Sequence, residues 1–270
     1  MKLHTRSKIN IGLFVTSRRP DGYHNIETVF YPLNLGDELI IEKNNTDTAQ
    51  LLLEGLPIEG NMEDNLLMKT YRIFKERYGI GGVDIRLQKQ VPMGAGLGGG
   101  SADAAYMAKG LNELFELGLS HQVLEEMVAQ LGADCAFFIQ AQPAYAEGIG
   151  NLLHPLPLQL KGYYLLLVKP DVHISTAAAY KAITPQASGC RLGEVLLNCE
   201  VSEWDKHIRN DFEQPVFAAH PIISDIKQKM YERGALYACM SGSGSSVFGI
   251  FASQPDTNGF EPHFVYTEAL

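Results

Sequence analysis

The sequence predicts an α+β fold, and two observations favour it. Segments with helical spacing are mixed irregularly with short alternating segments, instead of following them in a regular strand–helix repeat. The alternating segments also look like antiparallel strands joined by turns. With 270 residues, of which 46% are hydrophobic, the chain can bury the core of one large domain or two modest ones.

Strands dominate the first part of the chain. Residues 3–15 predict a strand that is polar at its start and apolar at its end, and the Arg-Arg-Pro-Asp-Gly run at 18–22 predicts a turn. Two further strands are expected at 37–42 and 50–53, joined by the polar tip at 44–47.

The central part combines helices with one strand. Apolar residues at helical spacing predict a helix over 67–78 that ends at Gly79. Alternation over 83–91 predicts a half-buried strand, in which Asp84, Arg86, Gln88 and Lys89 are the polar positions. Glycines then precede helices at about 102–117 and 121–131, the second of which ends at Gly132.

The last part predicts a smaller α/β arrangement. Residues 163–168 form an apolar strand, and the Pro- and Gly-containing stretch 155–162 before it is the expected domain seam. Pro221 fits the first turn of a helix that ends at Gly234. Strands at 235–240 and 247–252 flank a Ser/Gly turn. No function is assigned to the tail after Gln254.

Composition narrows the class of protein. The formal charge of −9 makes binding to a nucleic-acid backbone a poor expectation. The four cysteines have no CxxC spacing and predict reduced thiols. The N-terminus does not resemble a secretory signal, and the strongest apolar run is too short to span a bilayer. We therefore expect a cytoplasmic protein without nucleic-acid or membrane partners.

The glycine-rich loop at 92–101 is the strongest local signal, because it lies between a predicted strand and a predicted helix. Glycines let the backbone approach a ligand closely, and a helix N-terminus attracts phosphate. A tight turn alone would need only one or two of the five glycines. Ser101 is placed as the helix N-cap, or as a hydroxyl that reaches a phosphate or its metal.

The loop was compared with two common phosphate-binding patterns, and it fits neither of them well. A Walker A loop ends in Gly-Lys-Ser/Thr, and here no lysine precedes Ser101. Gly94, Gly96 and Gly99 match the dinucleotide pattern GxGxxG, but the preceding strand has alternating polar residues and no acidic residue ends a strand about 20 positions later.

Lys8 and Asp134 are the chemically suggestive residues outside the loop. Lys8 and Asn10 lie two residues apart on one face of a predicted strand, which is also what an exposed strand face would show. Asp134 precedes an apolar segment at 136–139, read as a strand, and is either a structural cap or a group poised for proton transfer. Beside a phosphate loop, an Asp can accept a hydroxyl proton and a Lys can stabilise phosphate charge.

Five motifs in order resemble the GHMP kinase superfamily: Ser7–Asn10, Asp21–His24, Pro92–Ala102, Leu131–Asp134 and Ser241–Gly244. They are most similar to the branch that phosphorylates 4-diphosphocytidyl-2-C-methyl-D-erythritol in non-mevalonate isoprenoid biosynthesis. The resemblance implies a two-domain fold with the active site in the interdomain cleft. The N-terminal domain would be 1–155, with the loop, Lys8 and Asp134, and the C-terminal domain 156–270.

The resemblance also implies roles for individual residues. It makes Asp134 the general base, gives Lys8 charge stabilisation, and implies ATP and Mg²⁺ as cofactors, with Ser101 and Asp134 as candidate metal ligands only. The implied ATP-binding residues are Pro92, Met93, Gly94, Ala95, Gly96, Leu97, Gly98, Gly99, Gly100, Ser101, Ala102 and Asn65, of which Asn65 fits equally as a helix cap. The implied substrate-binding residues are Asn10, Tyr23, His24, Thr176, Tyr180 and Gly242.

The substrate implied by the resemblance is a small molecule that carries a cytidine diphosphate group, and the enzyme would be a monomer or homodimer. Three of the substrate assignments have plain structural alternatives. Asp21–His24 fits an ordinary turn, Thr176 and Tyr180 fit a helix cap and its packing, and Ser241–Gly244 fits a hairpin turn. Competing functions are another GHMP kinase acting on homoserine, mevalonate or a sugar, a dinucleotide-dependent oxidoreductase, and a non-catalytic nucleotide-binding module.

Overall fold

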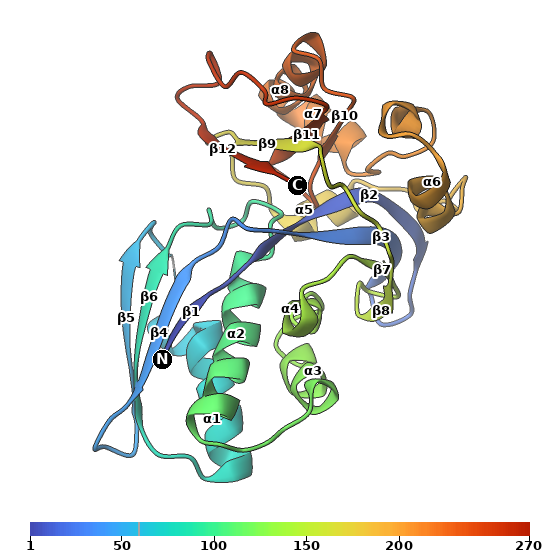
Figure 1. Ribbon diagram of the computed structural model, residues 1–270. Coiled ribbons are helices and arrows are strands. Elements are labelled where there is room, and N and C mark those ends of the chain that lie inside the picture. Colours follow the sequence, from blue (N-terminus) through green and yellow to red (C-terminus); the bar gives the residue numbers. More distant parts are fainter. Residues whose placement is uncertain (59) are drawn as a thin grey trace. The chain divides into compact units, whose positions relative to one another are not determined.

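The chain folds into two compact units, each built from several segments. The computed structural model describes residues 1–58 and 60–270. Unit 1 comprises residues 1–8, 32–93 and 98–142, and unit 2 comprises residues 9–31, 94–97 and 143–270. Helices and mostly antiparallel sheets occur together, so the α+β class predicted from the sequence is confirmed (Figure 1).

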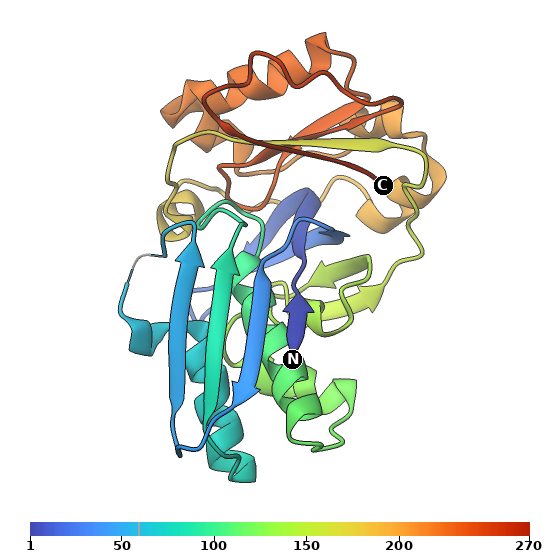
Figure 2. The ribbon, with the colours of Figure 1, turned by 60° about the vertical axis from the view of Figure 1, so that its left-hand side comes forward.

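Unit 1 is a four-stranded sheet with helices against it. The sheet has the strand order β1-β4-β6-β5, and its strands lie side by side in Figure 2. β4 pairs with β6 in antiparallel fashion, whereas β5 pairs with β6 in parallel. The elements are β1 (Lys2–His4), β4 (Glu38–Lys43), β5 (Ala49–Gly55), the 3₁₀ helix η1 (Met62–Asp64), α1 (Leu66–Tyr78), β6 (Val83–Lys89), α2 (Gly99–Leu114), α3 (His121–Ala129) and α4 (Phe137–Gln140).

Local sequence explains where the main elements of unit 1 begin and end. The side chain of Asn65 accepts a hydrogen bond from the Leu67 amide and caps α1, which stops at Gly79 with a φ of 64°. In α2, a face of small residues lets the helix approach the sheet closely. A Cβ atom on Gly110 would lie 2.5 Å from Ile41 Cδ1 on β4. Glycine at this position is what the close contact between helix and strand requires.

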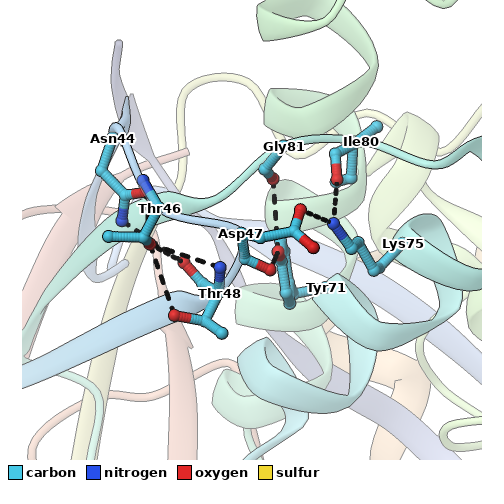
Figure 3. A network of polar contacts seen from close by, with 8 residues as sticks. All are labelled: Asn44, Thr46, Asp47, Thr48, Tyr71, Lys75, Ile80 and Gly81. Carbon is cyan, nitrogen blue, oxygen red and sulfur yellow. Dashed lines mark hydrogen bonds and ion pairs between the residues drawn. The ribbon is translucent and has the colours of Figure 1, made fainter.

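The polar tip at 44–47 is tied to the end of α1 (Figure 3). The Asn44 Oδ1 atom accepts from the amide of Thr46, which closes the turn. Lys75 donates to the carboxylate of Asp47 and to the carbonyl of Ile80, 2.9 Å away. The Tyr71 hydroxyl donates to the carbonyl of Gly81 over 3.2 Å. The network therefore fixes the loop after α1 against the turn between β4 and β5.

One helix boundary and one element type differ from the sequence predictions. α2 begins at Gly99 and not at about 102, because Gly98 at φ 69° serves as its N-cap without a side-chain bond. The apolar segment after Asp134 forms the short helix α4 and not a strand. Its two phenylalanines pack edge to face, with ring centroids 5.0 Å apart. None of the helices in the described residues is both long and apolar enough for a membrane span.

Unit 2 contains two further four-stranded sheets, with strand orders β2-β3-β7-β8 and β10-β11-β9-β12. Four of their strands, β3, β7, β8 and β12, have no counterpart among the elements expected from the sequence. The strands are β2 (Ser7–Arg18, from Ile9 onwards in this unit), β3 (His24–Leu33, up to Tyr31), β7 (Ala144–Glu147), β8 (Leu152–Pro155), β9 (Tyr164–Lys169), β10 (Tyr237–Met240), β11 (Val247–Phe251) and β12 (Phe264–Ala269).

Helices complete unit 2, with α7 and α8 beside the second sheet in Figure 1. They are α5 (Thr176–Lys181), α6 (Leu192–Asn198), the 3₁₀ helix η2 (Val201–Lys206), α7 (Glu213–Ala219) and α8 (Pro221–Glu232). Buried Ile223, Ile226 and Met230 face one side of α8 and join a core that includes Leu166 of β9. The tail after Gln254 contributes β12, which pairs with β9 along its whole length.

Candidate active site

The two predicted catalytic residues meet in unit 1. Lys8 lies on β2 with a side chain that is 4% exposed, and Asp134 follows α3 with a side chain that is 32% exposed. The Lys8 Nζ and Asp134 Oδ2 atoms are 3.4 Å apart. A Cβ atom on Gly98 would lie 3.2 Å from Lys8 Cε, so the pair is adjacent to the end of the glycine loop. A buried ammonium next to a partly exposed carboxylate is suited to stabilising an anion and accepting a proton.

Ser101 is not the N-cap of α2, and this corrects one of its two sequence interpretations. It lies in the first turn of the helix, because α2 begins two residues earlier at Gly99. Its hydroxyl faces the thiol of buried Cys135, and a Cβ atom on Gly132 would lie 3.8 Å from the hydroxyl oxygen. Burial raises the pKa of Cys135 to about 11, so this thiol stays protonated beside Asp134.

Unit 1 has a cavity of about 300 Å³ beside the loop, which we call the loop cavity. It unites three residues that the resemblance assigned to ATP: Asn65, Met93 and Gly100. Asn65 caps α1, which confirms that interpretation, and it also lines the cavity, while its contact with ATP stays a prediction. The other described residues that line it are Leu53, Ile58, Gly60, Asn61, Met62, Asp64, Leu66 and Asp103.

The middle of the glycine loop, residues 94–97, belongs to unit 2 and packs on the turn between β10 and β11. The Ser241 hydroxyl donates to the Gly96 carbonyl over 2.8 Å and accepts from the Asn10 amide over 3.1 Å. The Ser246 amide donates to the Ala95 carbonyl over 3.2 Å. The turn at 241–244 is therefore a hairpin turn that also holds the loop.

The predicted substrate residues of unit 2 form contacting groups, with one exception. His24 stacks on Tyr180 with ring centroids 4.9 Å apart and an interplanar angle of 18°. Thr176 begins α5, whose N-cap is Ser175, and its hydroxyl lies 2.9 Å from that of Ser243. Tyr23 is 62% exposed, which leaves its ring accessible to a ligand.

Asn10 and Gly242 also lie together in unit 2. A Cβ atom on Gly242 would be 3.3 Å from Asn10 Oδ1 and 3.4 Å from Gly96 Cα. The Asn10 Nδ2 atom donates to the Thr28 hydroxyl over 3.0 Å. Asn10 is therefore held from two sides, by β3 and by the hairpin turn.

Three charged residues that adjoin the loop are not among the site residues expected from the sequence: Asp37, Lys89 and Asp103. Lys89 was counted among the polar positions of its strand, yet it is 1% exposed. It lies on the same face of the strand as Val83, Ile85 and Leu87, because alternate residues point to the same side. A lysine at a position where the alternation calls for a buried apolar residue was therefore the signal.

Comparison with known proteins places the chain in a family. The model of the GHMP kinases N terminal domain matches residues 65–142, and that of the GHMP kinases C terminal domain matches residues 197–258. A 4-diphosphocytidyl-2-C-methyl-D-erythritol kinase of Bacteroides fragilis is 52% identical over 98% of this chain and 97% of its own length. The chain belongs to the GHMP kinase family. Membership implies the use of ATP, and it decides against a dinucleotide-dependent oxidoreductase.

Two further relatives support the assignment of the chain to this family. The 4-diphosphocytidyl-2-C-methyl-D-erythritol kinase of Bacteroides thetaiotaomicron is 49% identical over 93% of both chains. A crystal structure of 4-(cytidine 5'-diphospho)-2C-methyl-D-erythritol kinase has a TM-score of 0.78 at 31% identity, covering 93% of this chain and 90% of that one. In sequence, the chain is thus similar to relatives that carry the name of one activity, and a solved structure of that name shares its fold.

Proposed function

We propose that this GHMP kinase transfers the γ-phosphoryl group of ATP to the 2-hydroxyl of 4-diphosphocytidyl-2-C-methyl-D-erythritol, a step of non-mevalonate isoprenoid biosynthesis. The observation that carries the proposal is the Lys8–Asp134 pair, 3.4 Å apart beside Gly98. The names of the relatives support the choice of acceptor.

In this proposal Asp134 accepts the proton of the acceptor hydroxyl as that oxygen attacks phosphorus. A positioned base of this kind contributes typically about 10²–10⁴-fold to a rate. Lys8 stabilises the charge on the transferred group, and its burial strengthens that interaction because water is excluded. Phosphoryl transfer needs little more from the protein than such positioning and charge stabilisation.

The glycine loop would hold the ATP phosphates through its backbone amides and the N-terminus of α2. The loop cavity would take the nucleoside. Its volume is about 300 Å³, and its walls combine apolar side chains with the amides and carboxylates of two Asn and two Asp residues, which suits a purine base. Mg²⁺ would neutralise phosphate charge. Ser101 and Asp134 are the candidate ligands that the resemblance offers for this cation. No group of three or more His, Cys, Asp or Glu residues that could hold a metal occurs in the described part of the chain.

For the acceptor, we assign cytidine recognition to Asn10, Tyr23 and His24. The stack of His24 on Tyr180 supports this role, because it fixes the imidazole plane while leaving its edge for hydrogen bonds. Thr176 and Gly242 complete the proposed acceptor site, the latter through its contact with Asn10. We also propose the domain division at residue 155, which lies between the two matched family segments.

The test is acceptor-dependent release of ADP from Mg-ATP. The purified protein is given 4-diphosphocytidyl-2-C-methyl-D-erythritol, mevalonate, homoserine or galactose, with a no-acceptor control, and the product is assigned by ³¹P NMR. We expect turnover with the first acceptor alone. Turnover that is faster with one of the other three would replace the proposed acceptor and reassign Asn10, Tyr23 and His24.

A further inference from the structure

Three charged side chains are buried behind the glycine loop. The side chains of Lys89 and Asp37 are 0% exposed and that of Asp103 is 5% exposed. Lys89 Nζ forms ion pairs with both carboxylates, that with Asp103 at 2.8 Å. With both carboxylates ionised, the group would carry one negative charge in excess.

Such a group is a poor device for stability alone. Burying charges is costly, and well-packed apolar residues of similar volume often stabilise a fold as well or better. Burial raises the pKa of Asp103 to about 7 in spite of Lys89, with Asp37 adding to the rise. The folded protein therefore holds this carboxylate at an energetic disadvantage, which calls for a reason besides folding.

The positions of the three residues supply that reason. Asp37 Oδ1 accepts hydrogen bonds from the amides of Gln90 at 2.6 Å and Val91 at 2.8 Å, where the chain leaves β6 and enters the loop. At the other end, Asp103 stands on the second turn of α2, and a Cβ atom on Gly99 would lie 3.1 Å from Lys89 Nζ. One ammonium thus connects the start of the loop with its end.

The same group also adjoins the loop cavity. Asp103 lines it together with Met93 and Gly100. Its Oδ1 atom is buried and has no hydrogen-bond partner among the described residues, whereas Oδ2 binds Lys89. A displacement of Asp103 would therefore change both the separation of the loop ends and the wall of the cavity.

We infer that Asp37, Lys89 and Asp103 act as a loop clamp: a positioning cluster that holds the two ends of the glycine loop at the separation that the phosphates of a nucleotide require. The clamp acts through the loop and not on the reacting atoms. The inference rests on the proposed function only for the identity of the nucleotide, since the contacts concern the loop itself.

The test compares three variants of the full chain with the parent. Asp103→Asn keeps the size of the side chain and removes its charge, and Asp37→Asn does the same at the other end of the clamp. Glu113→Gln is the matched control, because it removes a carboxylate from an exposed position on the same helix. The readouts are hydrogen exchange of the amides of residues 93–98 in the free protein, the Kd of Mg-ADP, the KM of each substrate, and Tm.

We expect exchange at 93–98 to become at least about tenfold faster in both Asn variants, because the loop ends are no longer held together. The Kd of Mg-ADP and the KM of ATP should rise about tenfold, while the KM of the acceptor stays within about twofold. Glu113→Gln should match the parent. Folded variants with a lower Tm but parental exchange and ADP affinity would show that the cluster is only structural and would overturn the inference.

Failure of the proposed function is distinguishable from failure of the clamp. A parent protein that binds ADP but does not phosphorylate the acceptor would refute the acceptor, whereas the clamp would still be judged by exchange and ADP affinity. If Asp103→Asn does not fold, Asp37→Asn decides. It leaves an oxygen for the amides of Gln90 and Val91, and parental exchange in that variant also overturns the inference.

Discussion

Gly96→Ala tests whether the hairpin turn at 241–244 holds the glycine loop. Gly96 has a φ of 76°, and a Cβ atom there would lie 2.0 Å from the Ser241 carbonyl oxygen. Two costs follow. A non-glycine residue in the left-handed region costs roughly 1–2 kcal/mol. The methyl group also overlaps a backbone atom, which has no rotamer with which to move aside.

The overlap sets the magnitude of the effect on activity. Carbon and oxygen atoms normally approach no closer than about 3.3 Å, so the loop or the turn must shift by about 1.3 Å. A misplacement of about 1 Å in an active site can cost about 100-fold in rate. We therefore expect kcat/KM to fall about 100-fold, equivalent to about 2.7 kcal/mol of transition-state stabilisation.

The control separates the clash from the backbone conformation. Gly118 has a φ of 65° and no atom within 4 Å of its Cβ position, so Gly118→Ala carries the conformational cost without the clash. At roughly 2–4 °C per kcal/mol, Tm should fall by about 2–8 °C in the control, with unchanged kcat/KM. The assay is acceptor-dependent ADP release, with ADP affinity by calorimetry. A Gly96→Ala enzyme within about threefold of the parent would refute the reasoning.

Three further outcomes are expected. Asp134→Asn should abolish phosphoryl transfer and leave the Kd of Mg-ADP within about threefold, and near-parental turnover would remove Asp134 from the mechanism. Burial, aided by the charge of Arg6, lowers the pKa of Lys109 to about 8. Between pH 8 and about 10.5, the folded protein thus binds fewer protons than the unfolded chain. As the pH rises through that range, the Tm of the parent should therefore increase relative to that of Lys109→Met. A Tm difference that does not change with pH would contradict this. Finally, Cys135 should escape thiol labelling at pH 8 in native protein that labels half-buried Cys199, as read by peptide mass spectrometry; equal labelling would argue against its burial.

The elements that the sequence predicted well are those fixed by local chemistry. The helix that ends at Gly79 was found from apolar spacing and a glycine stop, and the strand at 83–89 from alternation, because both signals lie within one element. The predicted helix at 102–117 began three residues late. A glycine N-cap offers no side-chain signal, so Ser101 attracted the assignment instead.

Long-range packing accounts for most of what the sequence did not predict. The segment after Asp134 is apolar throughout and too short for its period to separate strand from helix, so α4 was mistaken for a strand. Nothing local indicates that residues 9–31 and 143–270 pack in one unit while 32–93 packs in the other. Strand pairing such as that of β3 with β7 creates this arrangement across more than 100 residues of chain.

The candidate site likewise has a part that sequence motifs predicted and a part that depends on contacts between distant residues. Lys8 and Asp134 are far apart in the sequence, and only the recognised motif order brought them together before the structure did. The loop clamp has no motif of its own. Lys89 becomes conspicuous only when its position in the alternation of β6 is compared with those of the buried residues Val83, Ile85 and Leu87. Its two carboxylate partners lie 52 and 14 residues away in the chain.

The pairing of β12 with β9 has a practical consequence for protein engineering. Val265 stands opposite Val168 and Thr267 opposite Leu166 in this ladder, and Leu270 exchanges backbone hydrogen bonds with the 162–163 segment. Cutting the chain before Phe264 would leave the four buried apolar residues of β9 as an open edge, and such an edge recruits strands from other molecules. Shortened versions that stop there are expected to aggregate during expression. A purification tag added after Leu270 should be separated from it by a flexible spacer.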